Sequence, residues 1–78
     1  DNEYVLSARL EIDKVNEMFN LDLPENDDYM TVGGLLLHVY QSFPKLNEIV
    51  TVGQYEFKII KKTMTKIELV RLKVNSTE

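Results

Sequence analysis

The spacing of apolar residues changes twice along this chain. Apolar and polar residues alternate from Tyr4 to Ile12, apolar residues recur at intervals of three and four between Asp13 and Phe43, and the alternation returns from Ile49 to Val74. Alternation is typical of a strand with one buried face, and the longer intervals are typical of an amphipathic helix. Because 78 residues support only one hydrophobic core, this order predicts a single α+β domain over residues 1–78.

The first part of the chain predicts a strand and then a short helix. The strand runs from Tyr4 to Ile12. Asp13 can accept hydrogen bonds from the first amides of the helix as its N-cap, and Asn20 can close the helix in the left-handed conformation. Three apolar residues share one face of this helix: Val15, Met18 and Phe19.

The next segment, residues 21–30, is acidic and contains Pro24. Proline disfavours helical backbone at the residue before it, so we expect a loop, with Leu21 and Leu23 turned inward and the acidic side chains in solvent. Thr31 is the expected N-cap of a second helix, which Pro44 should end. The apolar face of that helix comprises Val32, Leu35, Leu36, Val39, Tyr40 and Phe43.

The remainder predicts three strands, over residues 49–52, 55–60 and 67–74. Gly53-Gln54 suits a two-residue type II′ turn with glycine first, and a second turn is expected at residues 63–65. The apolar pattern of the last strand changes phase between Leu69 and Val70, which predicts a bulge. The whole order is β-α-α-β-β-β: a mostly antiparallel four-stranded sheet with two helices packed on one face.

Acidic and basic side chains are distributed unevenly along the chain. Residues 1–30 hold nine acidic and two basic side chains, and residues 31–78 hold seven basic and four acidic ones. An acidic chain is a poor partner for nucleic acid, and lysines on candidate strands more often protect a sheet edge. No apolar run approaches the roughly 20 residues that span a bilayer, so no direct membrane insertion is expected.

Few residues in the chain suggest catalytic or metal chemistry. His38 is the single histidine, and there is no cysteine, so neither a histidine-based nucleophile nor a cluster of imidazole or thiolate ligands is expected. Glu25, Asp27 and Asp28 offer oxygen ligands to magnesium, but their spacing lacks the pattern of a calcium-binding or related loop. We therefore predict no catalytic residues and no metal site.

Two consecutive glycines open the second helix, at Gly33 and Gly34. Each glycine costs a helix interior roughly 1 kcal/mol relative to alanine, so some contact should offset it. One hypothesis is that bare amides at Thr31, Val32, Gly33 and Gly34 approach a phosphate. The favoured interpretation is close packing of the helix start, since no phosphate-binding glycine motif is present.

These segments together resemble a known family. The residues that carry the resemblance are Leu21-Asp22-Leu23-Pro24, the acidic run after it, Thr31-Val32-Gly33-Gly34, and Ser42-Phe43-Pro44-Lys45 before a hairpin. The chain is similar over nearly its whole length to the transporter-associated domain of the CorC/HlyC family, a C-terminal module of magnesium and cobalt efflux or hemolysin-like proteins. It departs from the family pattern at Ala8 and Asn47, where glycines are expected.

The resemblance implies a noncatalytic regulatory or interaction module, excised from a larger ion-transport or hemolysin-like membrane protein. Its partners would be the other domains of that protein, a CBS pair and a membrane domain, on the cytoplasmic side of the bacterial inner membrane. The expected interaction surface is the acidic loop with Glu25, Asp27 and Asp28, or a sheet edge that pairs with a second copy.

An alternative also comes from the resemblance. Such domains share a fold with the FAD-binding domain of certain flavoenzymes, which suggests a module that binds FAD or another adenine nucleotide at residues 31–34. Likeness of fold does not place a flavin, and no cofactor is required by the residues themselves.

Overall fold

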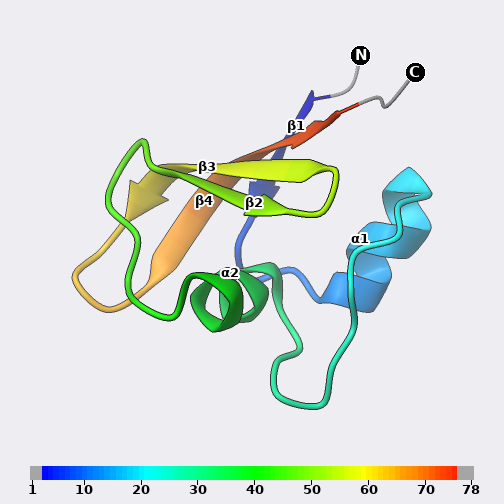
Figure 1. Cartoon of the computed structure of the whole chain (residues 1–78), viewed down its shortest axis with the longest axis horizontal. Helices are drawn as coiled ribbons and strands as arrows, with labels where there is room; N and C mark the ends of the chain where they lie inside the picture. Colours follow the sequence, from blue (N-terminus) through cyan, green and yellow to red (C-terminus); the bar gives the residue numbers. More distant parts are fainter. Residues whose placement is uncertain (1–2, 76–78) are drawn as a thin grey trace.

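The computed structural model describes residues 3–75. Its elements follow the predicted β-α-α-β-β-β order: β1 (Glu3–Ser7), α1 (Ile12–Phe19), α2 (Val32–Tyr40), β2 (Ile49–Val52), β3 (Tyr55–Lys62) and β4 (Ile67–Val74). The strands form one sheet in the order β1-β4-β3-β2, and every neighbouring pair is antiparallel (Figure 1). The predicted fold class is confirmed.

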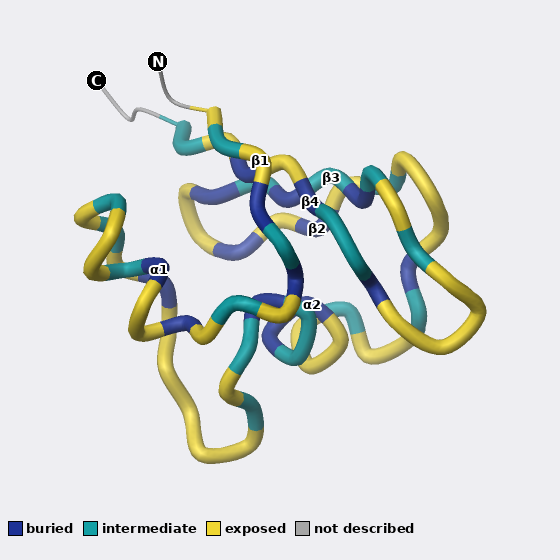
Figure 2. The backbone as a smooth tube through the Cα atoms, turned by 180° about the vertical axis from the view of Figure 1, so that it is seen from behind, coloured by how far each residue is buried: buried dark blue, intermediate teal, exposed yellow. Residues whose placement is uncertain are grey.

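Both helices lie on the same side of the sheet, so one sheet face is covered and the other is open (Figure 1). Alternate strand residues are therefore buried, as the change of colour along the strands shows in Figure 2. The covered face and the helices form one core. It consists of Leu6, Ala8, Ile12, Val15, Leu23, Val32, Leu35, Leu36, Val50, Val52, Tyr55, Phe57, Ile59, Ile67, Val70 and Leu72.

The first strand is shorter than predicted. It ends at Ser7 rather than at Ile12, although Ala8 and Ile12 are buried as the alternation requires. The Ser7 hydroxyl accepts a hydrogen bond from the Arg9 amide, and the Ser7 carbonyl accepts one from the Leu10 amide. These local bonds turn the chain out of the sheet, so apolar alternation continues through a bend that the sequence pattern does not reveal.

The start of α1 also corrects the sequence prediction. Glu11, not Asp13, is the N-cap, and its side chain makes no capping hydrogen bond. Asp13 lies in the first turn, where its charge favours the positive end of the helix dipole. Met18 is 60% exposed rather than part of the core. Asn20 does close the helix in the left-handed conformation, with φ of 56°.

The second helix begins as predicted but ends early. The Thr31 hydroxyl accepts a hydrogen bond from the Gly34 amide, which confirms the cap. The helix stops at Tyr40 because Gln41 adopts φ of 61°, so Pro44 follows the end and does not cause it. Val39 is 40% exposed at this end of the helix, and Phe43 lies beyond it.

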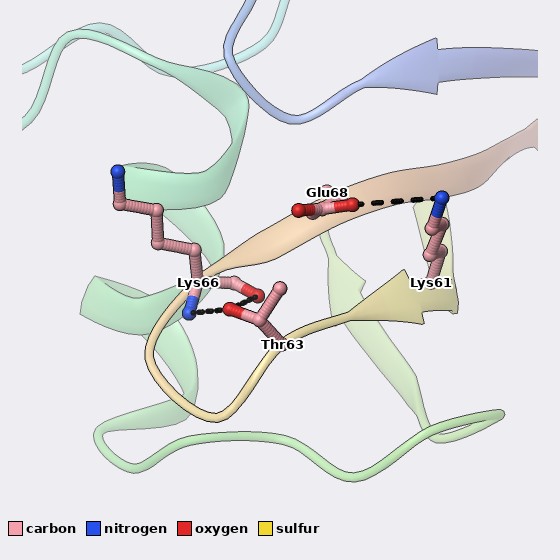
Figure 3. Close-up of polar contacts among 4 residues, drawn as sticks. All are labelled: Lys61, Thr63, Lys66 and Glu68. Atoms are coloured by element: carbon pink, nitrogen blue, oxygen red, sulfur yellow. Dashed lines mark hydrogen bonds and ion pairs between the residues drawn. The ribbon is translucent and has the colours of Figure 1, made fainter.

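Both hairpin turns are confirmed. Gly53 has φ of 59° and Gln54 does not have a positive φ, as a type II′ turn requires. The β3–β4 turn is closed by Thr63, whose hydroxyl accepts a hydrogen bond from the Lys66 amide at 3.0 Å (Figure 3). Asn47, where the family pattern expects glycine, also has a positive φ, of 68°, a conformation that asparagine tolerates.

The predicted bulge is present, one position earlier than expected. Glu68 is the extra residue of β4, since Leu69 and Ile67 pair with consecutive residues of β3, and Ile60 is an extra residue of β3. An ion pair of 3.8 Å between Lys61 Nζ and Glu68 Oε1 spans this irregular segment (Figure 3). Both side chains are well exposed, so the pair adds little stability.

The strand order overturns one interpretation of the lysines. Lys58, Arg71 and Lys73 lie on β3 and β4, which are the two central strands of the sheet. These cations therefore do not protect a sheet edge.

Candidate functional site

The acidic loop, residues 21–30, projects from the helix side of the sheet (Figure 1). Its tip is a turn from Asn26 to Tyr29, closed by a hydrogen bond from the Tyr29 amide to the Asn26 carbonyl. The Asn26 side-chain oxygen also accepts from the Asp28 amide at 2.9 Å. Asp27 and Asp28 occupy the two central positions of the turn and are exposed, so both carboxylates are presented to solvent from an ordered turn.

The base of the loop is fixed by Asn16 of α1. The Asn16 side-chain oxygen accepts from the Leu23 amide at 2.8 Å, and its NH₂ group donates to the Leu23 carbonyl at 3.0 Å. The Leu23 side chain is 2% exposed and anchors the loop in the core. One amide side chain thus satisfies both backbone groups of a buried loop residue, much as a neighbouring strand would.

Two tyrosines fix the rest of the loop. The Tyr55 hydroxyl, from β3, accepts from the Asp22 amide at 2.9 Å, and the Tyr29 hydroxyl donates to the Pro24 carbonyl at 3.0 Å. The Tyr55 hydroxyl also accepts from the Gln54 side chain at 3.2 Å. The loop is therefore tied to α1, to the sheet and to itself.

Glu25 is placed differently from the two aspartates. Its carboxylate accepts a hydrogen bond of 3.2 Å from the Asn16 side chain, beside a depression of about 160 Å³ between the loop and the start of α1. The lining residues are Glu11, Ile12, Asp13, Glu25, Asn26, Tyr29 and Met30. Three carboxylates line this depression, and none of residues 31–34 does, so it is an unfavourable place for a phosphate.

The amides at the start of α2 are already hydrogen-bonded within the chain. The Val32 amide donates to the Leu10 carbonyl at 2.9 Å, the Gly33 amide to the Ala8 carbonyl at 2.8 Å, and the Gly34 amide to the Thr31 hydroxyl. An anion at this helix start would have to displace these acceptors. Nucleotide binding at residues 31–34 stays a prediction from the resemblance that no contact in the described residues favours.

Close packing accounts for both glycines. A Cβ atom on Gly33 would lie 3.2 Å from the Ala8 carbonyl oxygen and 3.3 Å from the Ala8 Cβ. A Cβ atom on Gly34 would lie 3.0 Å from the Tyr29 Cβ. The glycines let α2 approach the end of β1 on one side and the acidic loop on the other, and this contact offsets their cost to the helix.

Within residues 3–75, no three histidine, aspartate or glutamate side chains are grouped so as to hold a metal ion. His38 is exposed, and its ring packs against that of Tyr29 with centroids 5.2 Å apart. The Tyr40 hydroxyl donates to the Glu48 carboxylate, which raises the pKa of Tyr40 and lowers that of Glu48.

The structure separates the predicted surface residues into two sets. Asp27 and Asp28 lie together at the tip, whereas Glu25 is held back against α1. The sequence prediction missed Asn16 and Tyr55, which position the loop. Their hydrogen bonds join residues 7 and 33 positions apart, and neither residue breaks the apolar pattern of its element, so no local signal could have identified them.

Among the described residues, no helix has the length and hydropathy to cross a bilayer. The family model "CorC_HlyC: Transporter associated domain" matches residues 1–76. Hemolysin C of Brachyspira hyodysenteriae is 34% identical over 80 residues, which cover 99% of this chain and 30% of that protein. The UPF0053 inner membrane protein YfjD of Escherichia coli (strain K12) is 30% identical over 60 residues, 77% of this chain and 14% of that protein.

The fold has also been solved in a relative. The crystal structure of a hemolysin domain from Enterococcus faecalis V583 superimposes with a TM-score of 0.84 and 28% identity, covering 97% of this chain and 92% of that one. This chain thus spans less than a third of the two curated relatives but nearly all of the solved domain.

Proposed function

Because the chain belongs to the CorC_HlyC family of transporter associated domains, we propose that it is a noncatalytic regulatory or interaction module. Its acidic loop docks on another domain of the larger protein that contains it. That protein is of the kind whose relatives carry the names hemolysin and UPF0053 inner membrane protein.

The observation that best supports this proposal is the fixed conformation of the acidic loop. The whole connection between α1 and α2, residues 20–31, has twelve residues without helix or strand, and connections of about this length or longer in a compact domain are commonly either functional or disordered. Here Asn16 fixes the base of the loop, Tyr55 and Tyr29 fix the rest of it, and its tip is a closed turn. A preformed loop loses little conformational entropy when it binds a partner, which favours a recognition surface.

The side chains at the tip indicate the chemistry of the partner. Asp27 and Asp28 are exposed, and Met30, two residues further along the loop, is 70% exposed. Two carboxylates followed closely in the chain by an exposed apolar side chain suit a basic surface with an apolar contact next to it. Exposed charges of this kind act chiefly on the rate of association and on selectivity, within a Debye length of about 8 Å at physiological ionic strength.

The finer parts of the proposal concern the larger protein. We place the module on the cytoplasmic side of the inner membrane, next to a CBS pair and a membrane domain, where it modulates transport of an ion such as magnesium or cobalt. The family resemblance supports this setting, and the name of the Escherichia coli relative agrees with a membrane location.

Charge reversal at the tip tests the docking surface. We would titrate purified residues 1–78 into the rest of the parent protein by calorimetry, using the wild type and the Asp27→Lys, Asp28→Lys double variant. The double variant should bind at least about tenfold more weakly, as expected when a charged contact is reversed. Glu17→Lys is the matched control, since Glu17 is exposed on α1. Equal affinity of the wild type and the double variant would overturn the docking surface.

A further inference from the structure

Two neighbouring rows of side chains on the open face of the sheet differ in their charge pattern. In the first row Glu3 lies opposite Lys73, and Lys73 lies opposite Glu56. Opposite charges thus face one another across three strands, an arrangement that stabilises a solvent-exposed sheet face. This row needs no partner to account for it.

In the second row, like charges face one another. Arg71 of β4 lies directly opposite Lys58 of β3, and like charges in that position destabilise a sheet. Among residues 3–75, the ion pair within 4.0 Å joins Lys61 to Glu68. Neither Arg71 nor Lys58 takes part in it. The two cations lie on central strands, so edge protection does not explain them.

Exposed aliphatic side chains flank the two cations. Val5 of β1 lies opposite Arg71, and Ile49 of β2 lies opposite Lys58. Val5 is 60% exposed and Ile49 is 52% exposed. The row therefore runs apolar, cationic, cationic, apolar across all four strands, with each side chain directed away from the helices, since the intervening residues Phe57 and Leu72 are fully buried.

We propose that this row, Val5-Arg71-Lys58-Ile49, is a second docking surface and that its occupant is an acidic segment from another part of the same larger polypeptide. A segment with one or two carboxylates between apolar side chains would neutralise the Arg71–Lys58 pair and cover Val5 and Ile49. This inference rests on the proposed function in one respect, that a larger protein supplies the segment.

The charge pattern favours a peptide carboxylate over a phosphate surface. Nucleic acids and anionic lipid bilayers attract clusters of cations undiluted by acidic groups. Here Glu3 and Glu56 lie in the adjacent row and the cationic pair is bounded by aliphatic residues. A carboxylate can fit between those acidic groups, whereas an extended anionic surface would be repelled by them.

Zero-length carbodiimide coupling of the intact parent protein tests this inference, because it joins an amine to a carboxylate only where the two are in contact. Mass spectrometry should find a link between Lys58 and an aspartate or glutamate outside residues 1–78 of the same polypeptide. Arg71→Gln, which removes the neighbouring positive charge without adding a carboxylate that could itself couple to Lys58, should reduce the yield of that link about tenfold. Lys66→Gln, an exposed change in the β3–β4 turn, should leave it unaltered.

Either of two crosslinking results would overturn the inference. One is the absence of a Lys58 link beyond residues 1–78. The other is a Lys58 link that joins two copies of the protein when isotopically light and heavy chains are mixed. A surviving effect of the Asp27→Lys, Asp28→Lys variant alongside either outcome would show that only this second surface fails. Binding of the domain to anionic vesicles through Arg71 would also contradict the proposed occupant.

Discussion

The β3–β4 hairpin and the acidic loop meet at Tyr55, yet different forces hold them in place. The hairpin buries Phe57, Ile59 and Leu72 completely, so its position depends on apolar packing. The loop buries one leucine, Leu23, and is held by the side chains of Asn16 and Tyr55. A small domain can therefore present an ordered, charged surface when a few polar contacts connect that surface to an apolar scaffold.

The largest expected effect is a loss of stability when apolar packing in the β3–β4 hairpin is removed. Phe57→Ala removes a fully buried ring from the hairpin and should lower the free energy of unfolding by about 3–5 kcal/mol. Lys58→Ala, at the next position on the open face, should change it by no more than about 0.5 kcal/mol. Urea unfolding of both variants measures the difference. Equal losses would show that the two sheet faces are not as different as the burial indicates.

A smaller effect is expected where the polar contacts hold the loop. Asn16→Ala leaves the Leu23 amide and carbonyl without their partner, which should cost about 1–3 kcal/mol. Hydrogen exchange at the Leu23 amide should become faster in the same variant, while exchange in β3 changes little. Glu17→Ala, one position along α1, serves as the control. An Asn16→Ala protein with unaltered exchange at Leu23 would show that apolar burial alone holds the loop.

A still smaller effect is expected at the junction between the loop and α2. Thr31→Ala removes the acceptor of the Gly34 amide, and loss of such a cap costs about 1 kcal/mol. Thr51→Ala, at an exposed position of β2, should have a smaller effect. Thermal unfolding compares the two variants. A larger loss of stability in Thr51→Ala than in Thr31→Ala would show that the Thr31 cap does not fix the junction between the loop and α2.

The smallest effect concerns pH and depends on Glu48, whose carbonyl accepts a hydrogen bond of 3.0 Å from the Ile59 amide of the hairpin. Hydrogen bonds from the Tyr40 hydroxyl and the Lys45 amide lower the pKa of Glu48 below its ordinary value of 4.5. The folded state therefore gains stability above that value and loses it as the pH falls through the lowered pKa. Tyr40 behaves in the opposite sense: its pKa is raised above 10.0, so its contribution is lost only as the pH rises through the raised pKa.

Glu48→Gln tests the acidic side of this pH dependence. The difference in unfolding free energy between wild type and variant should be larger at pH 7 than at pH 3, because the stability contributed by the ionised carboxylate begins to be lost below the ordinary pKa of 4.5. Urea unfolding at the two pH values measures it. A difference that did not change with pH would contradict the shifted pKa of Glu48.

Local patterns predicted the hairpin better than the loop. Gly53 and the alternation on both sides of it were enough for β2 and β3, and Pro24 was enough to predict a loop. The end of β1 was wrong because Ser7 turns the chain while apolar alternation continues to Ile12. The end of α2 was wrong because Gln41, a residue with no special preference for a positive φ, ends the helix.

The contacts that position the candidate surface could not be predicted for a different reason. Asn16 and Tyr55 act across the tertiary structure, and a polar residue in a helix or a tyrosine in a strand has many other uses. The double glycine was informative because it broke a local rule, and the contacts of Gly33 with Ala8 and of Gly34 with Tyr29 now supply its physical reason.

Hydrogen exchange in the intact parent protein shows directly whether the acidic loop is a docking surface. Amides at residues 22–31 should exchange more slowly in the wild type than in the Asp27→Lys, Asp28→Lys variant, because only the wild-type loop is covered by its partner. Amides of β3 should exchange equally in both proteins. Equal exchange at residues 22–31 in the two proteins would contradict the claim, because the loop would then face solvent in both.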